Sequence, residues 1–174
     1  MGVPTLFHGN TQVTSPKDKA SVLNEHCSSV FTNENFTSFP DIQDSGIPDL
    51  PDIIINSEGV EKLLNNINPN KASGPDAVPA KILQECAVSI APVLTKIFQK
   101  SLDTGSVPSV WRDANVTPLY KKCDRSTASN YRPVWLTSIP CKILEHIIHH
   151  HVLNHFDRFN VLANVQHGFR RGRS

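Results

Sequence analysis

The chain has 174 residues, 39% of them hydrophobic and 19% charged, which is an ordinary composition for a soluble globular protein. Its net charge of +1 conceals a division, because residues 1–70 carry three lysines against nine acids and residues 71–174 carry fourteen Lys or Arg against seven acids. A basic second half favours an anionic partner, although a solvated basic face gives the same count. Neither a signal peptide nor the roughly 20 apolar residues needed to span a bilayer is present, so we expect a soluble intracellular protein without membrane contact.

The first half of the chain predicts two helices joined by an acidic linker. Ser15 and Pro16 can begin a helix, after which apolar residues recur at helical spacing. Residues 33–52 are rich in Pro, Gly and acids, a composition typical of a linker. Helical spacing resumes at Ser57.

Two further helical stretches follow a loop rich in Asn, Gly and Pro. The loop lacks the glycine and lysine spacing of a nucleotide-binding P-loop, and its Asp76 is expected to cap the next helix. One helical stretch begins after Pro79, and the next runs through residues 90–102 to the turn at 103–106.

Residues 114–137 predict a β-hairpin. β-branched and aromatic residues cluster in ANVTPLYKK and YRPVWLT, on either side of the polar segment CDRSTASN. Pro118 and Pro133 confine these strands to positions where no backbone donor is needed. With Thr137 or Ser138 as a cap, a last helix then continues to about residue 156. The predicted fold class is therefore α+β and mostly helical.

Basic side chains concentrate in this hairpin and at the end of the chain. Lys121, Lys122 and Arg125 lie in the first strand and the turn, and Arg132 begins the return strand. Donors of this kind on a stiff ribbon suit phosphate recognition, although exposed turns also attract them for solubility. Residues 167–174 combine three arginines with a phenylalanine and two glycines, which fits nucleic-acid contact and also a frayed basic terminus.

Histidines crowd the last predicted helix. His146 and His150, and also His151 and His155, are spaced by four residues, which is compatible with a zinc site. H-E-x-x-H is absent and no cysteine lies at ligand spacing, so a solvated helix face is the preferred interpretation. No carboxylates are paired as two-metal phosphoryl transfer requires, and we assign no catalytic residue and no metal ligand.

Three segments, in order, resemble the reverse transcriptase of LINE-type (non-LTR) retrotransposons. They are KASGPDAVPAKIL at 71–83, VPSVWRDANVTPLYKKCDRSTASNYRPVWLTSIPCKILEHII at 107–148 and QHGFRRGRS at 166–174, with a weaker similarity at 18–34. The resemblance implies a partial fingers subdomain of a right-hand polymerase over residues 57–174, without the palm. Residues 1–56 would form an N-terminal extension and acidic linker.

The resemblance also implies roles for the basic residues. Lys121 and Arg132 would lie near an incoming nucleoside triphosphate or a template phosphate, and the segment from Gln166 would track the template. The expected nucleotide- or template-phosphate contacts are Lys121, Lys122, Arg125, Arg132, Gln166, Gly168, Phe169, Arg170 and Arg173. The intact enzyme would bind an RNA template, a DNA primer and deoxynucleoside triphosphates, use Mg²⁺, and occupy the cytoplasm and nucleus.

In this family the catalytic aspartates follow the region that the chain covers. We therefore expect a fragment that is not catalytic alone, with a non-enzymatic nucleic-acid-binding module or an inert remnant as the alternatives. The oligomeric state is left open. Three residues depart from the family pattern. Ala77 and Cys123 replace glycines, and at Cys123 this predicts a strained turn with φ > 0. Trp135 replaces a small polar residue, and we expect it to overfill its site on a packed strand.

Overall fold

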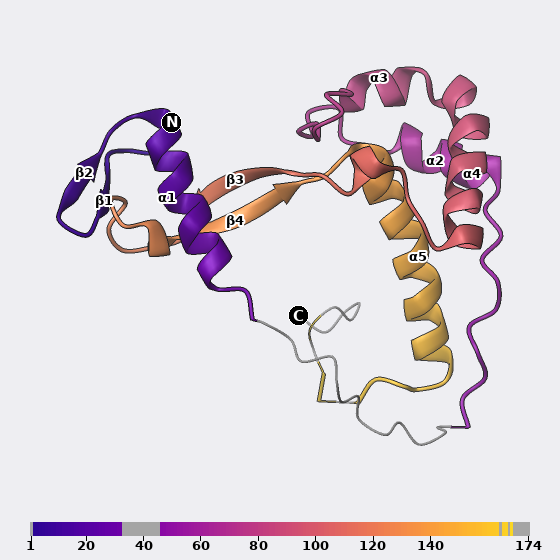
Figure 1. Cartoon of the computed structure of the whole chain (residues 1–174). Coiled ribbons are helices and arrows are strands. Elements are labelled where there is room, and N and C mark those ends of the chain that lie inside the picture. Colours follow the sequence, from indigo (N-terminus) through magenta and orange to yellow (C-terminus); the bar gives the residue numbers. More distant parts are fainter. Residues whose placement is uncertain (1, 33–45, 164, 167, 169–174) are drawn as a thin grey trace. The chain divides into compact units, whose positions relative to one another are not determined.

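The computed structural model describes residues 2–32, 46–163, 165, 166 and 168 (Figure 1). The chain groups into two compact units, the first made of residues 1–41 with 114–136 and the second of residues 42–113 with 137–174. The expected division at residues 56 and 57 falls inside the second unit, and as a division of function it stays a prediction. Three expected site residues, Phe169, Arg170 and Arg173, lie outside the described part of the chain.

The second unit is built from helices around one apolar core. Its elements are α2 (Ser57–Asn65), α3 (Ala80–Glu85), α4 (Ala87–Thr104), the short 3-10 helix η1 (Ser109–Trp111) and α5 (Ile139–Arg158). The core is centred on Phe98, which is fully buried and whose ring centroid lies 5.7 Å from that of Trp111. Each helix contributes apolar residues spaced three or four apart, so that one face of each is buried. The main contributors are Val60, Leu64, Leu83, Leu94, Ile139, Ile143 and Leu144.

The helix ends follow local sequence signals. Asn56 caps α2 by accepting a hydrogen bond from Gly59 N at 2.6 Å, and Ser138 caps α5 by accepting from Cys141 N at 3.3 Å. Gly105, with φ +62°, ends α4 in the left-handed conformation. The prediction that Asp76 caps α3 is wrong. α3 begins after Pro79 without a side-chain cap, and Asp76 Oδ1 accepts from Val78 N at 3.3 Å, within its own turn.

The loop between α2 and α3 is held against the start of α5. A Cβ on the buried Gly74 would lie 2.6 Å from the carbonyl carbon of Thr137 and 2.7 Å from Ser138 Cα, so only glycine fits there without a shift of the backbone. A second tie involves Gln99 of α4, whose side chain accepts from Ile55 N at 2.9 Å and donates to Ile53 O at 3.2 Å. These two contacts bring non-helical segments onto the helical core.

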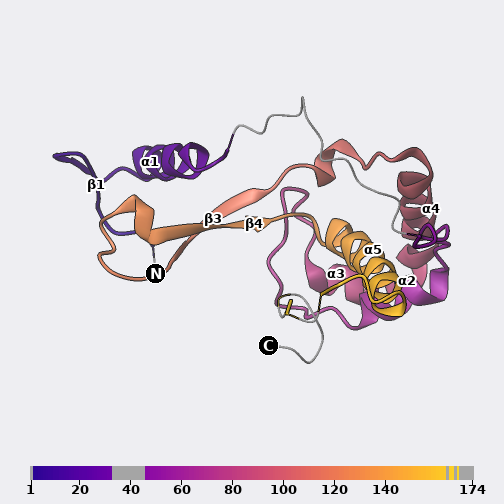
Figure 2. The same cartoon turned by 90° about the horizontal axis from the view of Figure 1, so that it is seen from below.

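The described residues of the first unit form two small antiparallel sheets, one α-helix and one short 3-10 helix. Its elements are β1 (Leu6–His8), β2 (Thr11–Val13), α1 (Pro16–Ser29), β3 (Asn115–Tyr120), the 3-10 helix η2 (Ala128–Asn130) and β4 (Tyr131–Leu136). The β3–β4 hairpin is present where the sequence predicts it, with Pro118 opposite Pro133. The β1–β2 hairpin was not expected from the sequence. α1 lies across the β3–β4 hairpin (Figures 1 and 2), and Leu6, Leu23 and Tyr131 form the small core between them.

The backbone at the two glycine replacements is left-handed. Cys123 has φ +71°, as the sequence predicts, and Ala77 has φ +53°. The expectation for Trp135 is wrong: its side chain is 51% exposed, so it overfills no packed site. In the described part of the chain, no helix has both the length and the apolar character needed to cross a membrane.

Candidate nucleic-acid interface

The loop between β3 and β4 is stabilised by side chains that bond back to its own backbone. Asp124 accepts from Ser126 N at 2.9 Å and from Ser126 Oγ at 2.6 Å, which closes a turn. Asn130 Nδ2 donates to Asp124 O at 2.7 Å, and Lys121 N donates to Asn130 O at 2.8 Å. Residues 121–130 therefore form an ordered loop, to which Phe7 N of β1 adds a long-range hydrogen bond to Ser126 O at 2.9 Å.

Two tyrosines support the same loop from the end of the strands. The Tyr131 hydroxyl donates to Arg125 O at 2.7 Å, and the Tyr120 hydroxyl donates to Cys123 O. Burial is the largest cause of a raised Tyr131 pKa, so this residue remains a neutral donor at physiological pH. The two rings meet edge to face with centroids 5.8 Å apart.

The loop and its flanking strands present exposed cations. Lys121, Lys122, Arg125 and Arg132 are all exposed. The Arg125 guanidinium lies 4.7 Å from the centroid of the Tyr120 ring, a cation–π contact that restricts its position. Strand alternation places Arg132, which pairs with Leu119, on the opposite face of the hairpin from Tyr131.

Little negative charge offsets these cations. The sole acid among residues 115–136 is Asp124, against four Lys or Arg. The hydrogen bond from the Ser126 side chain, and then that from the Ser126 backbone, lowers the Asp124 pKa, so the carboxylate stays ionised and engaged in the turn. Among the described residues, no acid lies within 4.0 Å of the side-chain nitrogens of Lys121, Lys122 or Arg132. These three cations are therefore available to an external anion.

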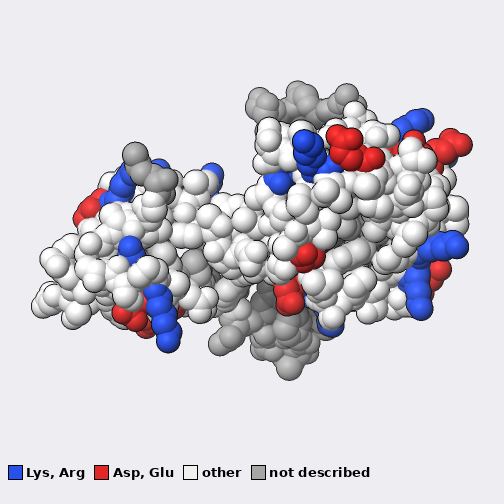
Figure 3. Space-filling model, turned by 90° about the horizontal axis from the view of Figure 1, so that it is seen from above, with Lys and Arg blue, Asp and Glu red and all other residues white. Residues whose placement is uncertain are grey.

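Charge is dispersed over one face of the molecule. Figure 3 shows one face of the molecule on which Lys and Arg occur in small separate groups, interspersed with Asp and Glu, over a surface that is mostly neither. This face therefore has no continuous basic field, and an anion would be held there by local groups of side chains rather than by a broad potential.

The remaining described site residues belong to the second unit. Gln166 and Gly168 are exposed, and Gln166 N donates to Ala163 O at 3.0 Å. The hairpin cations and this segment are thus on different units. Their expected cooperation on a template remains a prediction.

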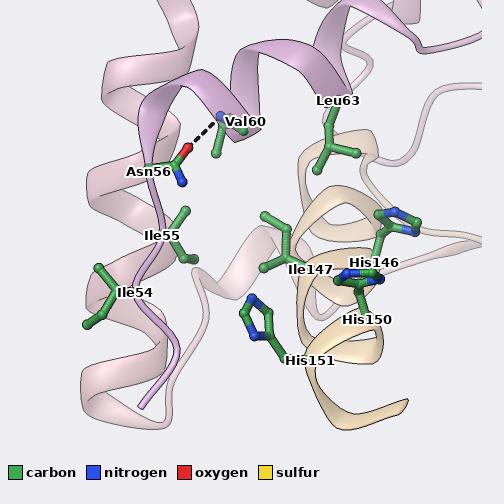
Figure 4. A pocket seen from close by; sticks show the side chains of 10 residues that line it. Ile54, Ile55, Asn56, Val60, Leu63, His146, Ile147, His150 and His151 are labelled. Carbon is green, nitrogen blue, oxygen red and sulfur yellow. Dashed lines mark hydrogen bonds between the residues drawn. The ribbon is translucent and has the colours of Figure 1, made fainter. Parts of the chain in front are cut away.

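The histidines of α5 do not converge on a metal site within the described residues, where no group of three or more His, Cys, Asp or Glu side chains is arranged to hold an ion. His150 Nε2 lies 2.9 Å from Asn154 Nδ2, and the His155 ring packs on Phe159. Figure 4 shows His146, His150 and His151 beside the apolar side chains of Ile54, Ile55, Leu63 and Ile147. The three histidines form one rim of an apolar cleft.

The residues that order the hairpin loop were missed from the sequence, although a signal for them was present. Asp124 and Ser126 stand two residues apart in a polar segment, the spacing at which an aspartate accepts from the backbone two residues on. Tyr120 and Tyr131 carry no comparable signal, because no residue pattern relates a tyrosine hydroxyl to a carbonyl three or six residues away before the loop has folded.

Comparison with known proteins yields a distant relative whose activity is known. No family model matches the chain. Over 122 residues, 70% of the chain, it is 28% identical to the RNA-directed DNA polymerase from the mobile element jockey of Drosophila melanogaster. The matched stretch covers 13% of the length of that relative. The chain is thus distantly related to a mobile-element reverse transcriptase, of which it spans a small part.

Proposed function

We propose that this chain is a segment of the fingers subdomain of a LINE-type retrotransposon reverse transcriptase, in which the β3–β4 hairpin contacts nucleic-acid phosphates. The observation that carries the proposal is the ordered loop at residues 121–130, whose flanking cations are exposed and, for Lys121, Lys122 and Arg132, without an acid within 4.0 Å among the described residues. The similarity to the jockey polymerase supports the same class of ligand. A rigid loop lowers the entropic cost of placing these donors on a phosphate.

In the intact enzyme, we propose that Lys121 and Arg132 contact an incoming nucleoside triphosphate or a template phosphate, with Lys122 and Arg125 beside them. The segment from Gln166 would follow the template. The partners are then an RNA template, a DNA primer and deoxynucleoside triphosphates.

Polymerases of this class use Mg²⁺, and the described residues of this chain do not fit that metal. Two-metal chemistry needs closely placed carboxylates. No cluster of three or more potential ligands occurs among the described residues. We therefore propose that this chain binds and positions nucleic acid.

The proposal is tested by titrating the chain with a fluorescent single-stranded RNA over a range of salt concentrations. If all four hairpin cations contact phosphates, log K should fall with log [salt] with a slope of about −3, from roughly 0.7 per contact. Lys122→Gln and Arg132→Gln should each make the slope shallower by about one contact and weaken all sequences similarly. Lys17→Gln, at an exposed lysine of α1 in the same unit, is the matched control. Equal effects of all three substitutions would refute the assignment to the hairpin.

Primer extension separates binding from catalysis. We expect no incorporation by this chain alone with Mg²⁺, a template and a primer, because the described residues provide no carboxylate cluster. Mg²⁺-dependent extension would overturn the assignment. A different outcome is that RNA binding depends on Lys122 and Arg132 while the same residues do not contribute to extension by a longer protein. That outcome would favour the alternative of a non-enzymatic binding module.

A further inference from the structure

A cavity that is lined by none of the hairpin residues lies between α2 and α5 in the helical unit. We call it the α2–α5 pocket. Its volume is about 530 Å³, which is within the usual range for small-molecule sites. It is lined by Leu63, Asn66, Ile67, Asn68, Lys71, Ile139, Lys142, Ile143 and His146. Four apolar residues form its floor, the polar residues form its rim, and no acid lines it.

The fold brings two lysines to this rim from distant parts of the sequence. Lys71 lies in the loop that the close approach of Gly74 holds against the start of α5, and Lys71 N donates to Asn68 O at 3.0 Å. Lys142 lies in the first turns of α5, where its backbone N donates to Ser138 O at 3.2 Å. Both side chains therefore start from fixed backbone positions.

The charge of these lysines is not neutralised by contact. Within the described residues, neither ammonium group has an acid within 4.0 Å. Burial, and next the charge of Lys71, lowers the Lys142 pKa, while Glu145 and Asp76 offset part of that effect from farther away. The first turn of α5 contains no acid, so Lys142 also faces the positive end of a 20-residue helix. An anion in the pocket would offset both the repulsion between Lys71 and Lys142 and the repulsion between Lys142 and the helix N-terminus.

The amides on the rim add complementary hydrogen-bonding groups. Asn66 uses its Nδ2 to donate to Lys62 O at 2.7 Å, which leaves its Oδ1 as an acceptor. Asn68 uses its Oδ1 to accept from Asn70 N at 2.9 Å, which leaves its Nδ2 as a donor. A flat polar group lying over Leu63 and Ile67 could satisfy both.

We propose that the α2–α5 pocket binds one nucleotide unit, with its phosphate on Lys71 and Lys142 and its base over the apolar floor. The phosphate can come from a free nucleotide or from one residue of a single strand. The site uses none of the hairpin residues, so it does not depend on the function proposed for the hairpin.

The test follows thermal unfolding of the full chain through Trp111, which lies in the core of the helical unit, in a Trp135→Phe background. Adenosine 5′-monophosphate should raise the unfolding midpoint in a concentration-dependent manner, and adenosine should not. Inorganic phosphate should act more weakly than the nucleotide, because it leaves the floor uncovered. A ten-nucleotide single strand that binds more tightly than the nucleotide, by an amount that Lys71→Met or Lys142→Met removes, identifies a strand as the source, and equal binding identifies a free nucleotide.

Substitutions assign the site to the two lysines. Lys71→Met and Lys142→Met should each weaken nucleotide binding about tenfold or more, the loss expected for one charge-assisted hydrogen bond. Without ligand, Lys142→Met should unfold at the same or a higher temperature, because a like-charge repulsion is removed. That result would exclude misfolding as the cause of its weaker nucleotide binding. Lys100→Met, at an exposed lysine of α4 in the same unit, should bind the nucleotide as the wild type does. Binding of adenosine equal to that of its monophosphate, or unchanged binding by both pocket variants, would overturn the proposal.

Discussion

The left-handed conformation of Ala77 makes a quantitative prediction about stability. Ala77 follows Asp76 in a turn closed by a hydrogen bond from its own N to Gly74 O at 3.1 Å, and its φ is +53°. A residue with a Cβ pays about 1–2 kcal/mol for this region, whereas glycine does not. The Ala77 side chain is exposed, so its removal sacrifices no buried surface.

Ala77→Gly should therefore stabilise the helical unit. The released strain of about 1.5 kcal/mol is offset by about 0.7 kcal/mol, because glycine gives the unfolded chain more freedom. The net gain of about 0.8 kcal/mol corresponds to a rise of about 3 °C in the unfolding midpoint for a unit of this size.

The measurement is urea and thermal unfolding followed by Trp111 fluorescence in the Trp135→Phe background. Ala72→Gly is the matched control, since Ala72 is an exposed alanine in the same loop without a positive φ. It should lower stability by about 0.4–1 kcal/mol, through the unfolded state alone. If both substitutions destabilise equally, the strain at Ala77 does not exist and the reasoning fails.

Three further predictions follow from the same structure. Cys123→Gly should slow hydrogen exchange of the β3–β4 amides by relieving the strain at φ +71°, whereas Cys123→Ala, which keeps the Cβ, should not. Gly74→Ala should lower the free energy of unfolding by about 1–3 kcal/mol in urea, because its Cβ would meet the backbone of Thr137 and Ser138; an unchanged midpoint would contradict that close approach. At pH 8, alkylation followed by mass spectrometry should modify the exposed Cys86 and Cys123 quickly and leave Cys141 intact, since burial, and next its hydrogen bond to Glu145, raises the Cys141 pKa to about 11. Equal labelling of Cys86 and Cys141 would contradict this protection of Cys141. Because the Cys141 pKa is raised on folding, the contribution of the neutral thiol to stability is present below pH 9 and is lost as the pH rises through about 11.

The sequence by itself determined the features that depend on neighbouring residues. The caps at Ser15 and Ser138, the end of α4 at Gly105 and the position of the β3–β4 hairpin are each set by nearby residues, and all are present in the structure. The positive φ at Cys123 belongs to this group, because a tight turn constrains its own backbone.

Tertiary structure decided everything that depends on which segments meet. Asp76 failed as a cap because the loop closes on itself and α3 starts four residues later, at Ala80. Trp135 is half exposed because its strand face is only partly covered. The meeting of Lys71 with Lys142 depends on Gly74, whose missing Cβ lets the loop touch the start of α5. Hydrophobic spacing indicates which face of a helix is buried, but it does not specify the partner, so no local pattern could place two lysines 71 residues apart at one pocket.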